Sequence, residues 1–198
     1  MKRLIDFLVS AAALLLLAPV LAVVALMVRW KLGSPVLFRQ LRPGLHGKPF
    51  WLIKFRSMRE SGESTDAARS DADRLDDFGR RLRSTSLDEL PELWNVLSGD
   101  MSLVGPRPLL MEYLPMYSSR QARRHEVRPG LTGWAQVHGR NAASWRERLE
   151  LDVWYVENHS FWIDLLVIWR TVWLVLSRSG TRHAGHATMP PFRGRQDD

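Results

Sequence analysis

The first long apolar run extends from Phe7 to Val28 and contains no charged residue. As an α-helix, these 22 residues would extend for ~33 Å, enough to reach across the hydrocarbon core of a bilayer. The run is too long for a secretory signal peptide, and Arg29 and Lys31 follow where a small-residue cleavage site would stand. The pattern therefore predicts that residues 1–31 form a retained membrane anchor.

Two features of this run leave its path through the membrane open. Lys2 and Arg3 precede it, and Arg29 and Lys31 follow it, so the positive-inside rule assigns no direction. Pro19, near the middle, removes one backbone hydrogen bond and clashes with the preceding turn. A re-entrant helix broken at this proline would return both cationic ends to one face. A kinked helix that spans the bilayer is the alternative, because membrane helices tolerate proline.

Shorter segments follow, separated by Gly, Pro and charged residues. Residues 35–40 and 49–58 are rich in Val, Leu, Ile, Phe and Trp, and Pro-Gly and Gly lie between them, which predicts a small β-hairpin with its loop over 41–48. Residues 60–81 are highly charged, which predicts a solvated loop that enters a short helix. The other predicted elements are helices over 87–97, 111–126 and 144–155, and a Gly-rich turn region with one short strand over 128–141.

The second strongly apolar segment, residues 161–176, is interrupted by Asp164 and Arg170. At sixteen residues it is too short and too charged to span a bilayer comfortably. Its tryptophans suit a helix that lies in the headgroup region, and an ordinary buried helix is the alternative.

Composition narrows the classes of partner. The 198 residues carry a formal net charge of +7, so an anionic partner is expected: nucleic acid, anionic lipid or a phosphorylated substrate. The chain has no cysteine, which excludes disulfides, thiolate chemistry and zinc sites built on cysteine. Nine tryptophans suit interfaces between water and lipid.

Asp88 and Glu89 are adjacent acids at the start of the predicted 87–97 helix. Ser86, three residues before Glu89, matches a capping box, and Pro91 is comfortable only in a first turn. Acids in a first turn also complement the helix dipole, which keeps a carboxylate ionised. By itself, this pattern indicates only a helix start.

Four arginines change that picture. Arg107, Arg128 and Arg140 stand close to Gly or Pro, and Arg83 precedes the acidic pair by five residues. Gly and Pro let a backbone approach a ligand or hold a rigid loop, and a guanidinium binds phosphate oxygens bidentately. One such arginine is usually part of a loop salt bridge. Several of them around adjacent acids indicate a site for phosphates and a divalent cation such as Mg²⁺.

Five motifs, in order, resemble one known family. They are KRLIDF, KFRSM, STSLDELPELWNVLSGDMSLVGPRP, RPGLTGWAQVHGRN and YVENHSFWIDL, and they cover roughly residues 2–177. The chain is similar to the bacterial sugar transferases, the monotopic polyprenyl-phosphate phosphoglycosyl transferases, in their minimal form. The resemblance implies transfer of a sugar phosphate from a UDP-sugar, with an N-acetylated hexosamine as a candidate, to polyprenyl (undecaprenyl) phosphate. UMP would be released, and the product would start a lipid-linked glycan.

The resemblance also implies roles for individual residues. Asp88 would be the nucleophile, forming a covalent aspartyl-phosphosugar intermediate, and Glu89 would be the second acid, with Mg²⁺ bound at the pair. Pro19 matches the family's helix-breaking proline and favours the re-entrant anchor. The candidates for binding substrate phosphates are Arg83, Arg107, Arg140, Lys54 and Arg56.

The expected fold is α+β and mostly helical, with an N-terminal re-entrant membrane helix, a small β-hairpin and several amphipathic interfacial helices. Residues 32–177 would form a cytosolic catalytic domain on the cytoplasmic face of the bacterial inner membrane, and residues 178–198 a disordered basic tail. The expected partners are the UDP-sugar, polyprenyl phosphate, the lipid bilayer and downstream membrane glycosyltransferases, but no nucleic acid.

Three positions depart from the family pattern: Ala18 where Ser is frequent, His138 where Asn is common and His159 where Trp is common. Two other classes of function stay open. A membrane-tethered nucleic-acid-binding protein would explain the charge, but the basic residues are scattered among acids and form no recognisable module. A non-catalytic membrane scaffold would explain the anchor, but it leaves the acids and arginines without a use.

Overall fold

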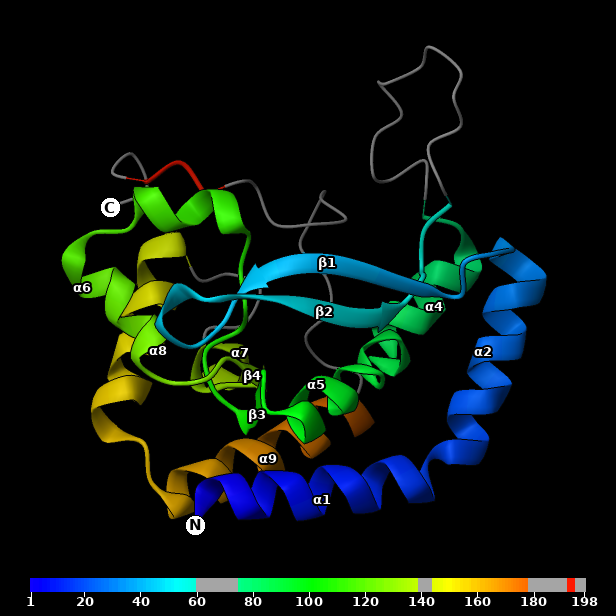
Figure 1. Cartoon of the computed structure of the whole chain (residues 1–198), viewed down its shortest axis with the longest axis horizontal. Helices are drawn as coiled ribbons and strands as arrows, with labels where there is room; N and C mark the ends of the chain where they lie inside the picture. The colour runs from blue at the N-terminus through cyan, green and yellow to red at the C-terminus, as the bar shows by residue number, and fades with distance from the viewer. Residues whose placement is uncertain (60–74, 139–143, 178–191, 195–198) are drawn as a thin grey trace.

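The N-terminal apolar run folds as two helices that meet at a sharp bend (Figure 1). The computed structural model describes residues 1–59, 75–138, 144–177 and 192–194. Helices α1 (Lys2–Leu16) and α2 (Ala18–Leu32) are bent by 63° at their junction. Pro19 lies in the first turn of α2, where a missing N–H breaks no hydrogen bond of that helix. Among the described residues, only this bent pair, taken together, is long and apolar enough to cross a bilayer, and no single helix is.

The beginning of α1 is attached to distant parts of the chain. The guanidinium of Arg3 donates to the carbonyl oxygens of Val96, at 2.5 Å, and Leu97, at 2.7 Å. Lys2 forms an ion pair of 2.5 Å with Asp164. The first turn of α1 is therefore held by side-chain contacts with the helices that contain Val96 and Asp164.

The predicted β-hairpin is confirmed. Strands β1 (Leu37–Pro43) and β2 (Pro49–Phe55) pair antiparallel, and the short 3-10 turn η1 (Leu45–Gly47) joins them. Residues 41–43, predicted as loop, pair within β1 instead. Because the hairpin continues to Pro43, its turn is tighter than the sequence indicated.

A side-chain amide joins the hairpin to helix α5 (Glu92–Ser98). The Oδ1 atom of Asn95 accepts from the backbone N–H of Ile53 at 3.0 Å, and its Nδ2 donates to the carbonyl of Trp51 at 2.8 Å. The amide thus forms the hydrogen bonds with the outer edge of β2 that a neighbouring strand would form. This contact holds α5 beside the strand that carries Lys54.

The other elements complete a mostly helical α+β fold around the hairpin (Figure 1). Strands β3 and β4 pair in parallel. The predicted helices at 144–155 and 161–176 are confirmed, and the short helix predicted after the charged loop is α4. The bounds are α4 Asp77–Ser84, η2 Leu87–Glu89, β3 Ser102–Val104, η3 Met111–Met116, α6 Ser119–Ala122, η4 Arg123–Glu126, β4 Gly130–Thr132, α7 Trp134–His138, α8 Trp145–Asn158 and α9 Phe161–Leu176.

Two predicted helices are divided. Residues 87–97 form the 3-10 turn η2 and then α5, with Pro91 at the N-cap between them. A single helix over 111–126 is wrong, because η3, α6 and η4 replace it. Pro115 lacks a donor within that segment, and Ser118 begins a new helix with its own capping box.

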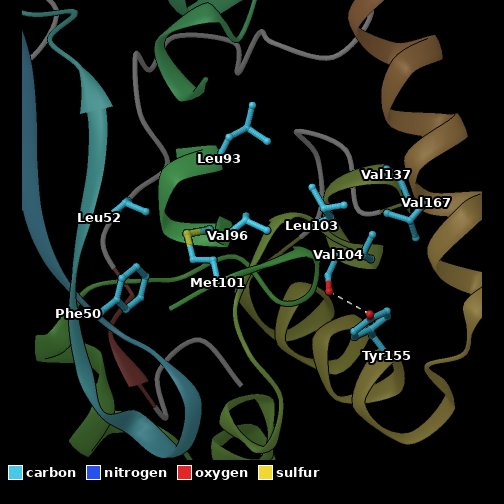
Figure 2. Close-up of a cluster of buried hydrophobic side chains, with 10 residues drawn as sticks. All are labelled: Phe50, Leu52, Leu93, Val96, Met101, Leu103, Val104, Val137, Tyr155 and Val167. Carbon is cyan, nitrogen blue, oxygen red and sulfur yellow. Dashed lines mark hydrogen bonds between the residues drawn. The ribbon is translucent and has the colours of Figure 1, made fainter. Parts of the chain in front are cut away.

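The core lies between the hairpin and helices α5, α7, α8 and α9 (Figure 2). Val96, Met101 and Val167 are completely buried in it. The hydroxyl of Tyr155 donates to the carbonyl of Val104 at 3.1 Å, as the dashed line in Figure 2 shows. The end of β3 is thereby fixed against α8, and the loop that follows β3 starts from a rigid point.

Helix α9 carries large apolar side chains on its surface. Trp162 is 76% exposed, and Trp169 and Trp173 are each 64% exposed, while Val167 faces the core. The alternative of an ordinary buried helix is therefore wrong. Other exposed apolar side chains gather on α1 and α2: Leu4, Phe7, Leu8, Leu15, Leu16, Val23, Leu26 and Trp30.

The predicted tail, residues 178–198, lies largely outside the described residues. Its described part, residues 192–194, includes Phe192, which is buried against the rings of Tyr113, Tyr117 and Trp145. The backbone N–H of Phe192 also donates to the Tyr113 hydroxyl at 3.2 Å.

Candidate functional site

The acidic pair does not form the predicted capping box. Ser86 adopts a left-handed backbone conformation, with φ of 54°, and its side chain caps no backbone group. The carboxylate of Glu89 turns instead toward Lys54 and Arg107. A capping box would have held that carboxylate on the backbone of Ser86, so the local turn releases it for tertiary contacts.

Lys54 and Arg107 meet the acids from two different parts of the fold. The Nζ atom of Lys54, near the end of β2, lies 2.9 Å from Oε1 of Glu89 and 2.8 Å from Oε1 of Glu92. The guanidinium of Arg107, in the loop after β3, donates to both carboxylate oxygens of Glu89. The structure therefore brings the acidic pair together with two of the predicted phosphate-binding residues.

Glu92 is a member of this cluster that the sequence interpretation missed. It is 1% exposed and shares Lys54 with Glu89. Its spacing of four residues from Asp88 and three from Glu89 was the available signal, since such residues share one face of a helix. A carboxylate on the inner face of an apolar helix calls for a cation beside it.

Burial and neighbouring charge set the protonation of the three acids. Burial and the adjacent Glu89 raise the pKa of Asp88 to about 6, although Lys54, Arg83 and Arg107 oppose the shift. Burial alone would favour neutral Glu89, but Arg107 and Lys54 outweigh it and hold its pKa well below the ordinary value. Burial raises the pKa of Glu92 to about 7, with Lys54 opposing.

The sequence predicted that a helix N-terminus keeps Asp88 ionised. A pKa of about 6 leaves this carboxylate mostly ionised at neutral pH, but burial shifts the pKa upward rather than downward. Asp88 lies in the short 3-10 turn η2, and helix α5 begins only at Glu92, four residues later. Asp88 is 7% exposed, and among the described residues its carboxylate accepts no hydrogen bond. Burial makes ionisation of Asp88 less favourable, and nearby cations that form no ion pair with it oppose that shift.

The remaining basic candidates lie in different surroundings. Arg83, on α4, donates from Nε to the hydroxyl of Ser57 at 2.9 Å and contributes to the positive potential at the acidic pair. Arg56 is buried and donates to the carbonyl oxygens of Leu32 and Ser34, where α2 ends. Arg140 lies outside the described residues. The predicted phosphate-binding roles stay predictions for all three.

The acids can be compared with the needs of a divalent cation. The described ranges contain no group of three or more His, Cys, Asp or Glu side chains that could hold a metal. Mg²⁺ usually takes one or two protein carboxylates and completes its shell with substrate phosphates and water. Asp88 and Glu89 supply that number, and the carboxylate of Asp88 is without a hydrogen bond. The donor set fits Mg²⁺ that binds together with a diphosphate.

Comparison with known proteins gives consistent matches. The model of the bacterial sugar transferase family matches residues 1–178. The chain is 52% identical over 197 residues to the uncharacterized sugar transferase EpsL of Bacillus subtilis (strain 168), which covers 100% of this chain and 98% of that protein. It is 44% identical to the UDP-glucose:undecaprenyl-phosphate glucose-1-phosphate transferase of Caulobacter vibrioides, over 86% of this chain and 68% of that protein. The UDP-N-acetylgalactosamine-undecaprenyl-phosphate N-acetylgalactosaminephosphotransferase of Aeromonas hydrophila is 37% identical, over 91% of this chain and 45% of its own length.

Proposed function

Since the chain belongs to the bacterial sugar transferase family and is a phosphoglycosyl transferase, we propose that it transfers a sugar phosphate from a UDP-sugar to polyprenyl phosphate. UMP is the leaving product, and polyprenyl-diphosphate-sugar is the lipid product. By their names, the Caulobacter vibrioides relative acts on UDP-glucose and the Aeromonas hydrophila relative acts on UDP-N-acetylgalactosamine. An N-acetylated UDP-hexosamine is our proposed donor, with UDP-glucose as its competitor in the test.

The observation that supports this function best is the state of Asp88. Its carboxylate is buried, free of hydrogen bonds among the described residues, and surrounded by the positive potential of Lys54, Arg83 and Arg107. A carboxylate without hydrogen bonds keeps its lone pairs for attack, and the cations lower the repulsion from an approaching phosphate.

The proposed reaction has two steps at one phosphorus. An oxygen of Asp88 attacks the phosphorus that carries the sugar, the anhydride bond to UMP breaks, and an aspartyl-phosphosugar forms. An oxygen of polyprenyl phosphate then attacks the same phosphorus and releases the carboxylate. One phosphoanhydride replaces another overall, so the protein's task is to position anions and stabilise their charge.

The other residues take roles that follow from their contacts. Glu89 holds Lys54 and Arg107 in place through its ion pairs, and these cations are left with further N–H groups to donate to phosphate oxygens. Arg140 is proposed to bind phosphate as well, on the family resemblance alone. Mg²⁺, held by Asp88 and Glu89 with the substrate phosphates, would neutralise part of the diphosphate charge.

We further propose that the bent pair of α1 and α2 enters and leaves the membrane on the cytoplasmic side. The bend of 63°, the exposed apolar side chains of both helices and the cationic residues at both ends support this path. The exposed tryptophans of α9 would lie in the headgroup region. Both surfaces would hold the site close to the phosphate of a lipid acceptor.

Two measurements test the function. Purified enzyme is supplied with Mg²⁺, polyprenyl phosphate and a panel of UDP-sugars, and UMP release is scored. Enzyme with the active donor but without acceptor is then examined by intact-protein mass spectrometry, where we expect the mass of one sugar phosphate at Asp88. Asp88→Asn should abolish the adduct, and Asp77→Asn, at an exposed position on α4, should retain it. Turnover without any adduct would indicate direct transfer, and no UMP release from any donor would refute the function.

A further inference from the structure

A second buried ion pair lies behind the candidate site. Arg124, in η4, donates from Nε at 3.0 Å and from Nη2 at 2.7 Å to the Oδ2 atom of Asp152, in α8. The side chains are 1% and 7% exposed. The guanidinium also faces the ring of Tyr117, at 5.7 Å from its centroid. Because both charges are removed from water, their contacts are much more expensive to form than those of a surface pair.

The guanidinium of Arg124 has a further acceptor, which belongs to the candidate site. Its Nη2 donates to the backbone carbonyl of Arg107 at 2.6 Å. Arg107 stands between Pro106 and Pro108, neither of which has an N–H to donate, so this part of the loop has few backbone donors of its own. The carbonyl oxygens on each side also accept hydrogen bonds from other parts of the chain. That of Pro106 accepts from the N–H of Gly130 at 3.0 Å, and that of Pro108 accepts from the guanidinium of Arg42 at 3.5 Å.

The contribution of the Arg124–Asp152 pair to stability can be distinguished from its role in positioning Arg107. Replacement of a buried ion pair by apolar residues of similar volume is often neutral for stability, or even favourable. An apolar pair could therefore fill the space of Arg124 and Asp152, but it could not donate to the carbonyl of Arg107. The pair supplies a donor in one fixed direction at the backbone of an arginine whose guanidinium contacts Glu89.

We propose that Arg124, oriented by Asp152, is a positioning residue that fixes the backbone of Arg107 and so aims its guanidinium at the transferred phosphate. This inference rests on the proposed function, because the transferred phosphate is part of it. It assigns a role in the reaction to a pair that contacts neither the acids nor, by its burial, any substrate. The carboxylate of Asp152 orients Arg124, Arg124 fixes the backbone of Arg107, and Arg107 binds the transferred phosphate.

The test removes both charges at once. In Arg124→Met/Asp152→Leu, neither member of the pair is left as a buried charge without the other, so the thermal midpoint should stay close to that of the wild type, while UMP release should fall by about 10-fold to 10²-fold. The matched control is the exposed pair of Arg120 and Glu150, which joins α6 and α8 at 3.0 Å. The substitutions Arg120→Met/Glu150→Leu should leave UMP release unchanged.

A double-mutant cycle with Arg107→Ala distinguishes positioning from scaffolding. If Arg124 acts through Arg107, the Met/Leu pair should cost less than about 2-fold in UMP release once Arg107 is alanine. An equal loss in both backgrounds, or full activity of the Met/Leu variant in the wild-type background, would overturn the inference. Arg124→Lys enters the same cycle if the double variant does not fold, because lysine keeps the charge but lacks the fork. A wild-type enzyme that releases no UMP would instead overturn the proposed function, and this inference with it.

Discussion

Replacement of the candidate nucleophile should make the protein more stable while it removes activity. The pKa of Asp88 is raised from its ordinary value of 3.8 to about 6, chiefly by burial. Its ionised form is therefore less favourable in the folded protein than in the unfolded chain. At ~1.4 kcal/mol for each pH unit between these values, the ionised carboxylate opposes folding by ~3 kcal/mol at neutral pH. Asp88→Asn removes that charge with little change of volume.

The pH dependence of this effect follows from the sign of the shift. A raised carboxylate pKa produces no penalty below pH ~4, where Asp88 is protonated in both states, a growing penalty between pH ~4 and ~6, and a constant penalty above. For a chain of this size, ~3 kcal/mol corresponds to an increase in thermal midpoint of about 6 to 12 °C. The increase should thus be present at pH 7.5 and absent at pH 4.

The assay is thermal unfolding of the purified enzyme in detergent or nanodiscs, without Mg²⁺ or substrate, at both pH values. Asp77→Asn is the matched control, because the hydrogen bond from Arg80 lowers the pKa of Asp77, so its ionised form favours folding. This control should show no stabilisation at either pH. An unchanged or lower midpoint for Asp88→Asn at pH 7.5, or an equal increase at both pH values, would refute the electrostatic reasoning.

The remaining predictions concern chemistry, topology and packing. Formation of the adduct should slow about 10-fold for each pH unit below ~6, as Asp88 becomes protonated; a rate independent of pH from 5 to 7 would contradict this. UMP release should stop in the presence of a chelator and return with Mg²⁺. Arg107→Ala should reduce transfer by ~10², and lysine there should restore it only in part. Single cysteines near residue 2 and at residue 60 should both be labelled from the cytoplasmic side, and Pro19→Ala should favour a straight spanning helix that moves one of them. Phe192→Ala should lower the thermal midpoint, because a buried ring leaves a cavity; an unchanged midpoint would show that the aromatic contacts are dispensable.

The local sequence pattern was sufficient to predict those helices and strands that depend mainly on their own residues. The apolar run with Pro19, the hairpin with its Pro-Gly turn and the amphipathic segment of residues 161–176 all appear where hydrophobic periodicity placed them. The acidic pair also lies at the start of a helical segment. In these cases the spacing of apolar residues and the turn-forming residues determine the element over a few neighbouring positions, so both can be read directly from the sequence.

The candidate site needed tertiary contacts that no local pattern encodes. Glu89 would cap its own helix if Ser86 adopted an ordinary conformation, but Lys54 and Arg107 offer the carboxylate two charge-assisted hydrogen bonds instead. Glu92 reads as one more acid in a helix until Lys54, 38 positions away in the chain, is seen beside it. Side chains that meet across such distances are set by the packing of strands and helices, which follows from the whole sequence.

The contacts at the beginning of α1 have a consequence for the order of events during synthesis. Lys2 precedes its partner Asp164 by 162 residues, and Arg3 precedes the carbonyl of Val96 by 93. At ~5–20 residues per second, Asp164 leaves the ribosome roughly 8–30 s after Lys2. The interval for Arg3 is shorter, because its partner is closer in the chain, and each cation is solvated by its surroundings until that partner has been made. The contacts of α1 with α5 and α9 can therefore form only after those helices have been synthesised, so they join the first residues to be translated to parts of the chain that are made much later.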